Sequence, residues 1–195
     1  MGLDMYLDKM PRHDKATARE ISLLESYIDY KEACGNPGSE ARNCSMKEWC
    51  GVDEKDVPLE LLEFYKSFYD KKYSAWDTEK RFGFCRITEN VAYWRKANAI
   101  HDWFVNHVQD GVDDCAYHDE VTKDILESLL ETCEKVLSTP KLATELLPTT
   151  EGFFFGSTDY DRYYYEDVKY TAETVREILE TTDFEKEMLY YISSW

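Results

Sequence analysis

The sequence lacks every common motif by which an enzyme or a cofactor site is identified. It contains no GxGxxG loop, no P-loop, no HExxH helix, no GxSxG turn and no CxxC pair. Its histidines are scattered, and His101 and His107 are six residues apart, which does not place them on one face of a helix. We therefore expect no cofactor and favour a protein without catalytic residues. An enzyme whose site is not visible in the sequence remains an alternative.

Long apolar runs are also missing. No run approaches the roughly 20 residues that cross a membrane, and the opening MGLDMYLDKM has no apolar core of the kind found in signal peptides. Both features predict a cytoplasmic protein with reduced cysteines. Cys34, Cys44 and Cys50 cluster, but their gaps of nine and five residues and the lack of a nearby histidine do not fit a zinc site. The acidic loop 110–119 misses the spacing of a calcium-binding EF-hand. We therefore expect no bound metal.

Basic residues are scarce in the second half of the chain. The net charge is −17, and residues 101–195 carry 22 acidic but only 7 basic side chains. Such a surface repels nucleic acid and anionic membranes, so we expect direct binding to neither. It is suited instead to a basic protein partner, either directly or as a mimic of nucleic acid. The alternative is an acidic solvated face that only keeps the protein soluble.

The remaining composition is that of a folded protein. Aromatic residues make up 15% of the 195 residues, which argues against disorder and provides for a real core. We expect a single domain over residues 1–195. Within it, residues 34–56 contain glycines and a proline and are expected to form a loop-rich excursion.

Hydrophobic periodicity predicts an α+β fold that is mainly helical, with about five main helices. The central stretch Glu89–Val108 is expected to be one helix, because its apolar residues cover roughly half of the helical circumference. Three further helices are expected over residues 14–33, 58–73 and 122–137, and a fourth is expected to follow a capping box at Thr158 and to end near Thr181.

Alternation of apolar and polar residues predicts short strands. Gly2–Leu7 and Met188–Ile192 have this pattern, and Arg81–Ile87 is a further candidate. Two terminal strands that are separated by helices pair most simply with each other. We therefore expect a small sheet that joins the N- and C-terminal strands.

Two segments carry candidate ligand-binding residues. On the expected central helix, Asn98 and His101 fall within the apolar arc, with Arg95 on its flank, so both need hydrogen-bond partners in the core or on a ligand. In residues 152–165, glycines allow close approach of a ligand, free amides attract an anion and aromatic rings offer stacking faces. The candidate set is Arg95, Asn98, His101, Phe153, Phe154, Phe155, Gly156, Ser157, Tyr160 and Arg162.

Both segments also have a purely structural interpretation. Asn98 and His101 would then be satisfied core residues, and Phe153–Phe155 would form a hydrophobic plug that closes the core. Acidic residues between 159 and 167 would moreover repel a phosphate. Neighbouring side chains of an extended turn alternate sides, however, so at least one of the three phenylalanines should face outward or into a cavity.

Several strings resemble a family of small uncharacterised bacteriophage proteins. They are the opening MGLDMYL, the central YWRKANAIHDWF, the segment LLPTTEGFFFGSTDYDRYYYEDVKYT and the closing SSW. The resemblance covers both ends and most of residues 89–195, with no matching pattern over residues 8–80. It implies a phage or prophage protein in the bacterial cytoplasm that acts on the host, and it implies no active-site residues.

Three functional hypotheses follow. The first is a counter-defence protein that binds and sequesters a small nucleotide-like ligand through the candidate residues above. The second is an acidic inhibitor of a basic host protein, and the third is an enzyme. We favour the first, and a pocket lined by the candidate residues would support it.

Overall fold

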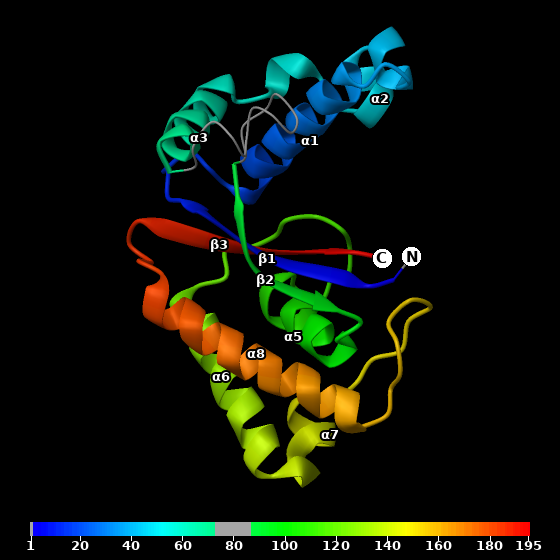
Figure 1. Ribbon diagram of the computed structural model, residues 1–195, viewed down its shortest axis with the longest axis vertical. Helices are drawn as coiled ribbons and strands as arrows, with labels where there is room; N and C mark the ends of the chain where they lie inside the picture. Colours follow the sequence, from blue (N-terminus) through cyan, green and yellow to red (C-terminus); the bar gives the residue numbers. More distant parts are fainter. Residues whose placement is uncertain (1, 73–86) are drawn as a thin grey trace. The chain divides into compact units, whose positions relative to one another are not determined.

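The computed structural model describes residues 2–72 and 87–195, and the chain divides into two compact units. Unit 1 comprises Met1–Lys9 and Asn90–Trp195, and unit 2 is Met10–Glu89, which lies between them in the chain. The described residues contain seven α-helices and a three-stranded antiparallel sheet (Figure 1). Two of the helices are only five and four residues long, which leaves five main ones. The predicted α+β class with about five main helices is confirmed.

The sheet has the N-terminal strand at its centre. Strand β1 (Asp4–Pro11) lies between β2 (Glu89–Arg95) and β3 (Glu187–Ser194). The predicted pairing of the two terminal strands is therefore confirmed, and Figure 1 shows both chain ends at the same end of the sheet. Met5 and Leu7 are fully buried on β1, which explains the apolar alternation in the sequence.

The prediction of one central helix over Glu89–Val108 is wrong in its first half. Residues Glu89–Arg95 form β2, and helix α5 begins only at Asn98 and ends at Val108. On β2 the buried Ala92 and Trp94 alternate with exposed neighbours, which is the period of a strand. Tertiary pairing with β1 decides the outcome for a short segment that is rich in β-branched and aromatic residues.

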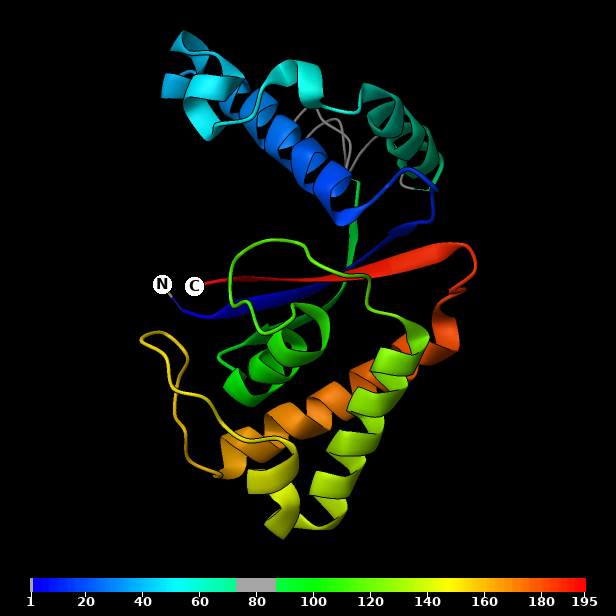
Figure 2. The same cartoon turned by 180° about the vertical axis from the view of Figure 1, so that it is seen from behind.

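Helix α5 lies between the sheet and a pair of long helices, α6 (Lys123–Ser138) and α8 (Arg162–Thr181), as Figures 1 and 2 show. On one side the Phe104 ring of α5 stacks on Tyr191 of β3 with ring centroids 4.3 Å apart. Across to α8, the Trp94 indole of β2 donates a hydrogen bond to the Thr171 hydroxyl at 2.9 Å. These contacts hold α5 against the sheet and the end of β2 against α8.

The boundaries of the long helices follow from their caps. Thr122 caps α6 as predicted, because its hydroxyl accepts a hydrogen bond from the Ile125 amide. The predicted cap of α8 at Thr158 is wrong, since Asp161 holds that position and accepts from the amides of Tyr163 and Tyr164. Between α6 and α8 lie a 3-10 turn, η3 (Pro140–Leu142), and the short helix α7 (Ala143–Leu146).

Unit 2 is helical. It contains α1 (Ala18–Gly35), η1 (Glu40–Asn43), α2 (Met46–Cys50), η2 (Glu54–Asp56) and α3 (Leu59–Lys72). The first predicted helix starts later than expected, after Thr17 rather than Asp14, because residues 13–16 form a turn closed by a backbone bond from Ala16 to His13. The excursion 34–56 is more regular than a loop. Ser45 and Glu48 form a capping box that starts α2 within it.

Two further findings concern single segments. Among the described residues, no helix combines the length and the apolar composition required to cross a lipid bilayer. The strand predicted over Arg81–Ile87 lies almost entirely outside the described residues.

Candidate functional site

A pocket of about 310 Å³ opens in unit 1 where β2 turns into α5. Its walls come from three segments: the β2–α5 turn, the loop that precedes α8, and the first two turns of α8. The lining residues are Arg95, Lys96, Ala97, Asn98, Ala99, Ile100, Thr149, Gly156, Ser157, Asp159, Asp161, Tyr163, Tyr164, Asp167 and Val168. The volume lies at the lower end of the range of about 300–1,000 Å³ that is typical of small-molecule sites.

The first wall is a tight turn with a left-handed residue. Lys96 has a φ of 61°, a conformation that side chains other than glycine rarely adopt. Its amide donates to the Leu3 carbonyl at 2.8 Å, and its own carbonyl accepts from the Asn98 amide at 2.9 Å. These two bonds hold the turn in its left-handed conformation.

Helix α5 presents its amino end to this pocket without a cap. Its N-cap residue is Ala97, which has no side-chain acceptor. Within the described part of the chain, no side chain accepts from the amides of Ala99 or Ile100, which both line the pocket. Free first-turn amides and the helix dipole favour an anion at such a position.

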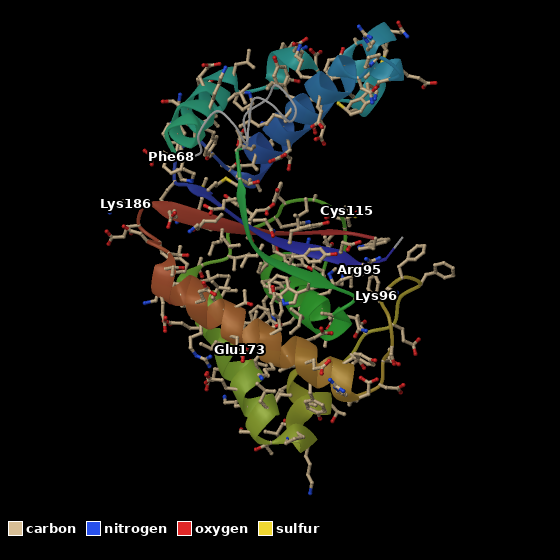
Figure 3. The ribbon with its side chains drawn as sticks, viewed as in Figure 1. Phe68, Arg95, Lys96, Cys115, Glu173 and Lys186 are labelled. Atoms are coloured by element: carbon tan, nitrogen blue, oxygen red, sulfur yellow. The ribbon has the colours of Figure 1, made fainter. Side chains whose placement is uncertain are left out.

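Two cations stand at the same wall, and Figure 3 shows both where β2 ends. The Arg95 side chain is 61% exposed, and among the described residues the only carboxylate within 4 Å of its guanidinium is that of Asp4, 3.8 Å from Nε. No carboxylate of a described residue lies within 4 Å of the Lys96 amine. The Lys96 stem passes close to Gly2 and Gly156, where an added Cβ would meet it at 3.3 and 3.2 Å. Glycine at both positions therefore gives this side chain its space.

Asn98 joins the first wall to the loop. It is 4% exposed, and its amide nitrogen donates to the carbonyls of Phe155 at 3.1 Å and Ser157 at 2.8 Å. Its amide oxygen accepts from the Thr150 backbone at 3.2 Å. The side chain is thus occupied by the loop backbone, so Asn98 shapes the pocket instead of offering free hydrogen-bonding groups to a ligand.

The opposite wall is acidic, and its carboxylates differ in their partners. Asp161 accepts from the α8 amides, and Asp159 accepts from the Ser157 hydroxyl at 3.1 Å. No described side chain donates to Asp167, which is half-buried. Burial, followed by the nearby charges of Glu166 and Asp161, raises the pKa of Asp167 to about 6. This carboxyl group is available to accept hydrogen bonds from a ligand above that pH.

Tyrosines complete the α8 wall. The Tyr164 hydroxyl donates to the Leu147 carbonyl at 2.8 Å, and burial raises the pKa of this phenol well above its ordinary value, so it stays protonated. Tyr163 is 73% exposed at the rim, with its ring open to a planar group.

His101 does not line the pocket, although it was predicted as a site residue. Its Nδ1 lies 2.7 Å from the Tyr191 hydroxyl and its Nε2 lies 3.0 Å from the Asp113 carboxylate. Burial lowers the pKa of His101 despite the neighbouring carboxylate. The expectation that His101 has hydrogen-bond partners is confirmed, and both partners belong to the protein. Because the ring is 1% exposed, it cannot reach a substrate, and it serves the core.

The three phenylalanines have three different environments. Phe155 is buried against the edge of His101, Phe154 is half-buried, and Phe153 is 94% exposed. The expectation that at least one ring faces outward is therefore confirmed. A Cβ on Gly152 would lie 2.4 Å from the Phe155 ring, so this turn requires glycine to let Phe155 fold back into the core.

Beside the pocket is a second, open hollow of about 500 Å³, and Gly156 lines both. Phe153 lines the hollow together with Glu151, Gly152 and Thr158.

Two further predicted site residues, Tyr160 and Arg162, do not line the pocket. Tyr160 accepts from the Thr149 amide through its hydroxyl, and the exposed Arg162 pairs with Glu166 at 2.6 Å.

Sequence reasoning thus located four lining residues, Arg95, Asn98, Gly156 and Ser157. It missed Lys96 and the acidic wall. Asp167 was noted only as a residue that would repel phosphate, whereas its spacing of four from Tyr163 places both on one face of α8. No group of three or more histidine, cysteine or acidic side chains suited to a metal ion occurs in the part of the chain that the structure describes.

Comparison with known proteins gave no match. No protein-family model, no curated protein and no solved structure is significantly similar to this chain.

Proposed function

We propose that this protein is a phage-encoded accessory protein that sequesters a small nucleotide-like ligand in the bacterial cytoplasm. The observation that carries the proposal is the division of one small pocket into a cationic and an acidic wall. Arg95, Lys96 and the open amino end of α5 suit a phosphate. Asp167 suits groups that donate hydrogen bonds, such as ribose hydroxyls or the amino groups of a base.

The separation of charges is the reason to prefer a nucleotide to a simple anion. The acidic wall repels an inorganic phosphate and lowers its affinity, whereas a nucleotide places its phosphate at one wall and neutral donors at the other. The absence of a recognisable catalytic group among the pocket residues supports binding without turnover. The resemblance to small phage proteins supports the context, in which removal of a host signalling molecule is useful to a phage.

Calorimetry and thermal-shift measurements with cyclic, monophosphate and ADP-ribose-type nucleotides test the proposal. We expect micromolar or tighter binding, and Arg95→Ala should weaken it tenfold or more, since about 1.4 kcal/mol corresponds to a factor of ten. Arg162→Ala is the matched control, because it removes the same charge from an exposed residue outside the pocket lining. The proposal fails if none of these nucleotides binds, or if both variants lose affinity equally.

One observation favours a second candidate, an acidic surface that docks on a basic host protein. Glu127, Glu131 and Glu134 are exposed along α6 within the half of the chain that carries most of the negative charge. Each has a basic partner within 4 Å, however, namely Lys123, Lys135 and Arg176, respectively. These ion pairs weaken the negative potential of the three glutamates, so we rank the acidic docking surface second.

Charge reversal distinguishes the two candidates. If α6 is the docking face, lysine at all three glutamate positions should abolish capture of the partner from host lysate, and capture should weaken steeply with salt. Nucleotide binding in the pocket should be unaffected by the same variant. Capture that is indifferent to both changes would exclude the acidic docking surface.

A further inference from the structure

Phe153 is the most exposed large apolar side chain of the described residues, at 94%. Neither the core nor the proposed nucleotide pocket uses its ring. Phe154 contacts it edge-on, with ring centroids 4.7 Å apart, which orients Phe153 without covering it. The face of this ring is therefore open to a planar group from solvent.

The position of Phe153 links it to the pocket. The open hollow of about 500 Å³ beside Phe153 and the pocket of about 310 Å³ share one wall residue, Gly156. Gly156 has no side chain to separate the two spaces, and its φ of 93° together with the nearby Lys96 backbone disfavours any larger residue. A molecule that reaches from one space to the other would therefore pass over the Gly156 backbone with no side chain in its way.

The loop that carries Phe153 is anchored and not free. Its backbone carbonyls at Phe154 and Phe155 accept from the Leu3 amide at 3.2 Å and the Asn98 side chain at 3.1 Å. The buried Phe155 ring fixes the same turn from below. A ligand that stacks on Phe153 thus meets a surface whose distance from the pocket is already set, which lowers the entropic cost of binding.

From the adjacency of the two spaces at Gly156 and the open ring of Phe153, we infer that the site has two parts and takes a ligand with two planar groups, of the dinucleotide class. One nucleotide unit occupies the pocket beside Lys96 and Asp167. The second base crosses Gly156 and stacks on Phe153, where its hydrogen-bonding edge faces Glu151 and Thr158. This inference rests on the proposed nucleotide-binding function and specifies its ligand class.

The chemistry of the hollow favours a base over a second phosphate. Its only charged lining residue is Glu151, which repels anions, and its aromatic and glycine surfaces suit a flat, uncharged group. An apolar protein partner that covers Phe153 is the competing occupant, and it predicts no difference in affinity between dinucleotides and monophosphates.

Calorimetry with cyclic di-AMP, cyclic di-GMP and the matching nucleoside monophosphates tests the inference. Base stacking on an aromatic ring predicts that the better dinucleotide binds at least about tenfold more tightly than its monophosphate. Phe153→Ala should remove that difference and leave monophosphate affinity unchanged. Phe153→Leu should behave like the alanine variant, and Phe153→Trp should retain dinucleotide binding, because the π face and not apolarity is required.

The controls make failure interpretable. Phe153 is almost fully exposed, so its replacement should not lower the melting temperature of the protein, and Phe68→Ala on α3 controls for loss of an exposed phenylalanine elsewhere. Equal affinity for dinucleotides and monophosphates, with no effect of Phe153→Ala, overturns the two-part site but leaves the proposed function intact. Absence of binding by every nucleotide overturns both. Retention of full dinucleotide affinity by Phe153→Leu also overturns the stacking role.

Discussion

The two helices that start at the pocket begin in opposite ways. Asp161 caps α8 by accepting from the amides of Tyr163 and Tyr164, whereas α5 starts at Ala97 with no side-chain cap. The two capping positions also differ in burial, since Asp161 is exposed whereas Ala97 is buried, at 3% exposure. The same kind of helix end is therefore closed by the protein on one wall and left open on the other.

The difference shows which groups a ligand can use. At α8 the carboxylate of Asp161 has taken the place of an anion, so this end has little remaining attraction for phosphate. At α5 the equivalent amides face the pocket beside Lys96, and the structure supplies no internal anion. The difference in charge between the two sides of the pocket thus arises partly because α8 has a capping carboxylate and α5 has none.

Removal of the Asn98 side chain, which joins α5 to the loop before α8, should have the largest effect on stability. Asn98→Ala deletes hydrogen bonds to Phe155, Ser157 and Thr150, and it leaves buried backbone groups without partners. We expect a loss of about 3 kcal/mol in the free energy of unfolding, measured by urea denaturation. An unchanged stability would mean that the loop does not depend on Asn98.

Removal of the α8 cap should cost less. Asp161→Ala leaves the amides of Tyr163 and Tyr164 unpaired, and we expect about 1 kcal/mol of destabilisation by the same measurement. Asp161→Asn retains the acceptor and should recover most of this loss. Asp161→Ala also frees the first amides of α8 toward the pocket, so the affinity for phosphate should rise in this variant. A fall in phosphate affinity would contradict the comparison of the two helix ends.

The acidic wall should make stability depend on pH. The pKa of Asp167 is raised to about 6 in the folded protein, above the ordinary value of 3.8, so the folded state binds this proton more tightly. The resulting stabilisation is complete below about pH 4 and is lost as the pH rises through 6. Asp167→Asn should therefore be more stable than the natural protein at pH 7.5, by less than about 1 kcal/mol after allowance for solvent screening. The two proteins should differ least at pH 4.

Replacement of Lys96 in the strained turn should give the smallest change in stability. It should stabilise the protein slightly but weaken nucleotide binding. Lys96→Gly relieves the left-handed conformation but adds freedom to the unfolded chain, so we expect a net gain of about 0.5 kcal/mol. Nucleotide affinity should nevertheless fall about tenfold with loss of the charge. Lys96→Met keeps the strain and should lose only affinity. If Lys96→Gly binds as well as the natural protein, the lysine has no role in the site.

Much of the fold could be predicted from the sequence, and the errors have a common cause. The terminal strands and the helices over α3, α6 and α8 have one dominant period or a clear capping residue, so local pattern sufficed. Residues Glu89–Arg95 fit a helical arc and an alternating strand about equally well. Their pairing with β1, which is remote in the sequence, decides between the two.

The site was less accessible to sequence reasoning. Arg95 and Gly156 were found because charge and glycine content are visible in a single segment. Lys96 was missed because its left-handed conformation arises only when β2 ends and α5 begins there. His101 was misplaced for the related reason that a buried polar residue can serve a core network as well as a ligand, and only the partners Tyr191 and Asp113 distinguish them.

The central position of β1 also determines when its two edges can be paired during synthesis of the chain. The strand leaves the ribosome before both of its partners, since β2 begins at Glu89 and β3 only at Glu187. At the usual elongation rate of about 5–20 residues per second, its apolar side chains wait on the order of ten seconds or longer for the second partner. Unit 2 lies wholly within that interval and can fold before unit 1 is closed. Once β2 is complete at Arg95 it can pair with one edge of β1, but the other edge stays unpaired until β3 is made. An unpaired strand edge is prone to aggregation, so we expect chaperone dependence during expression.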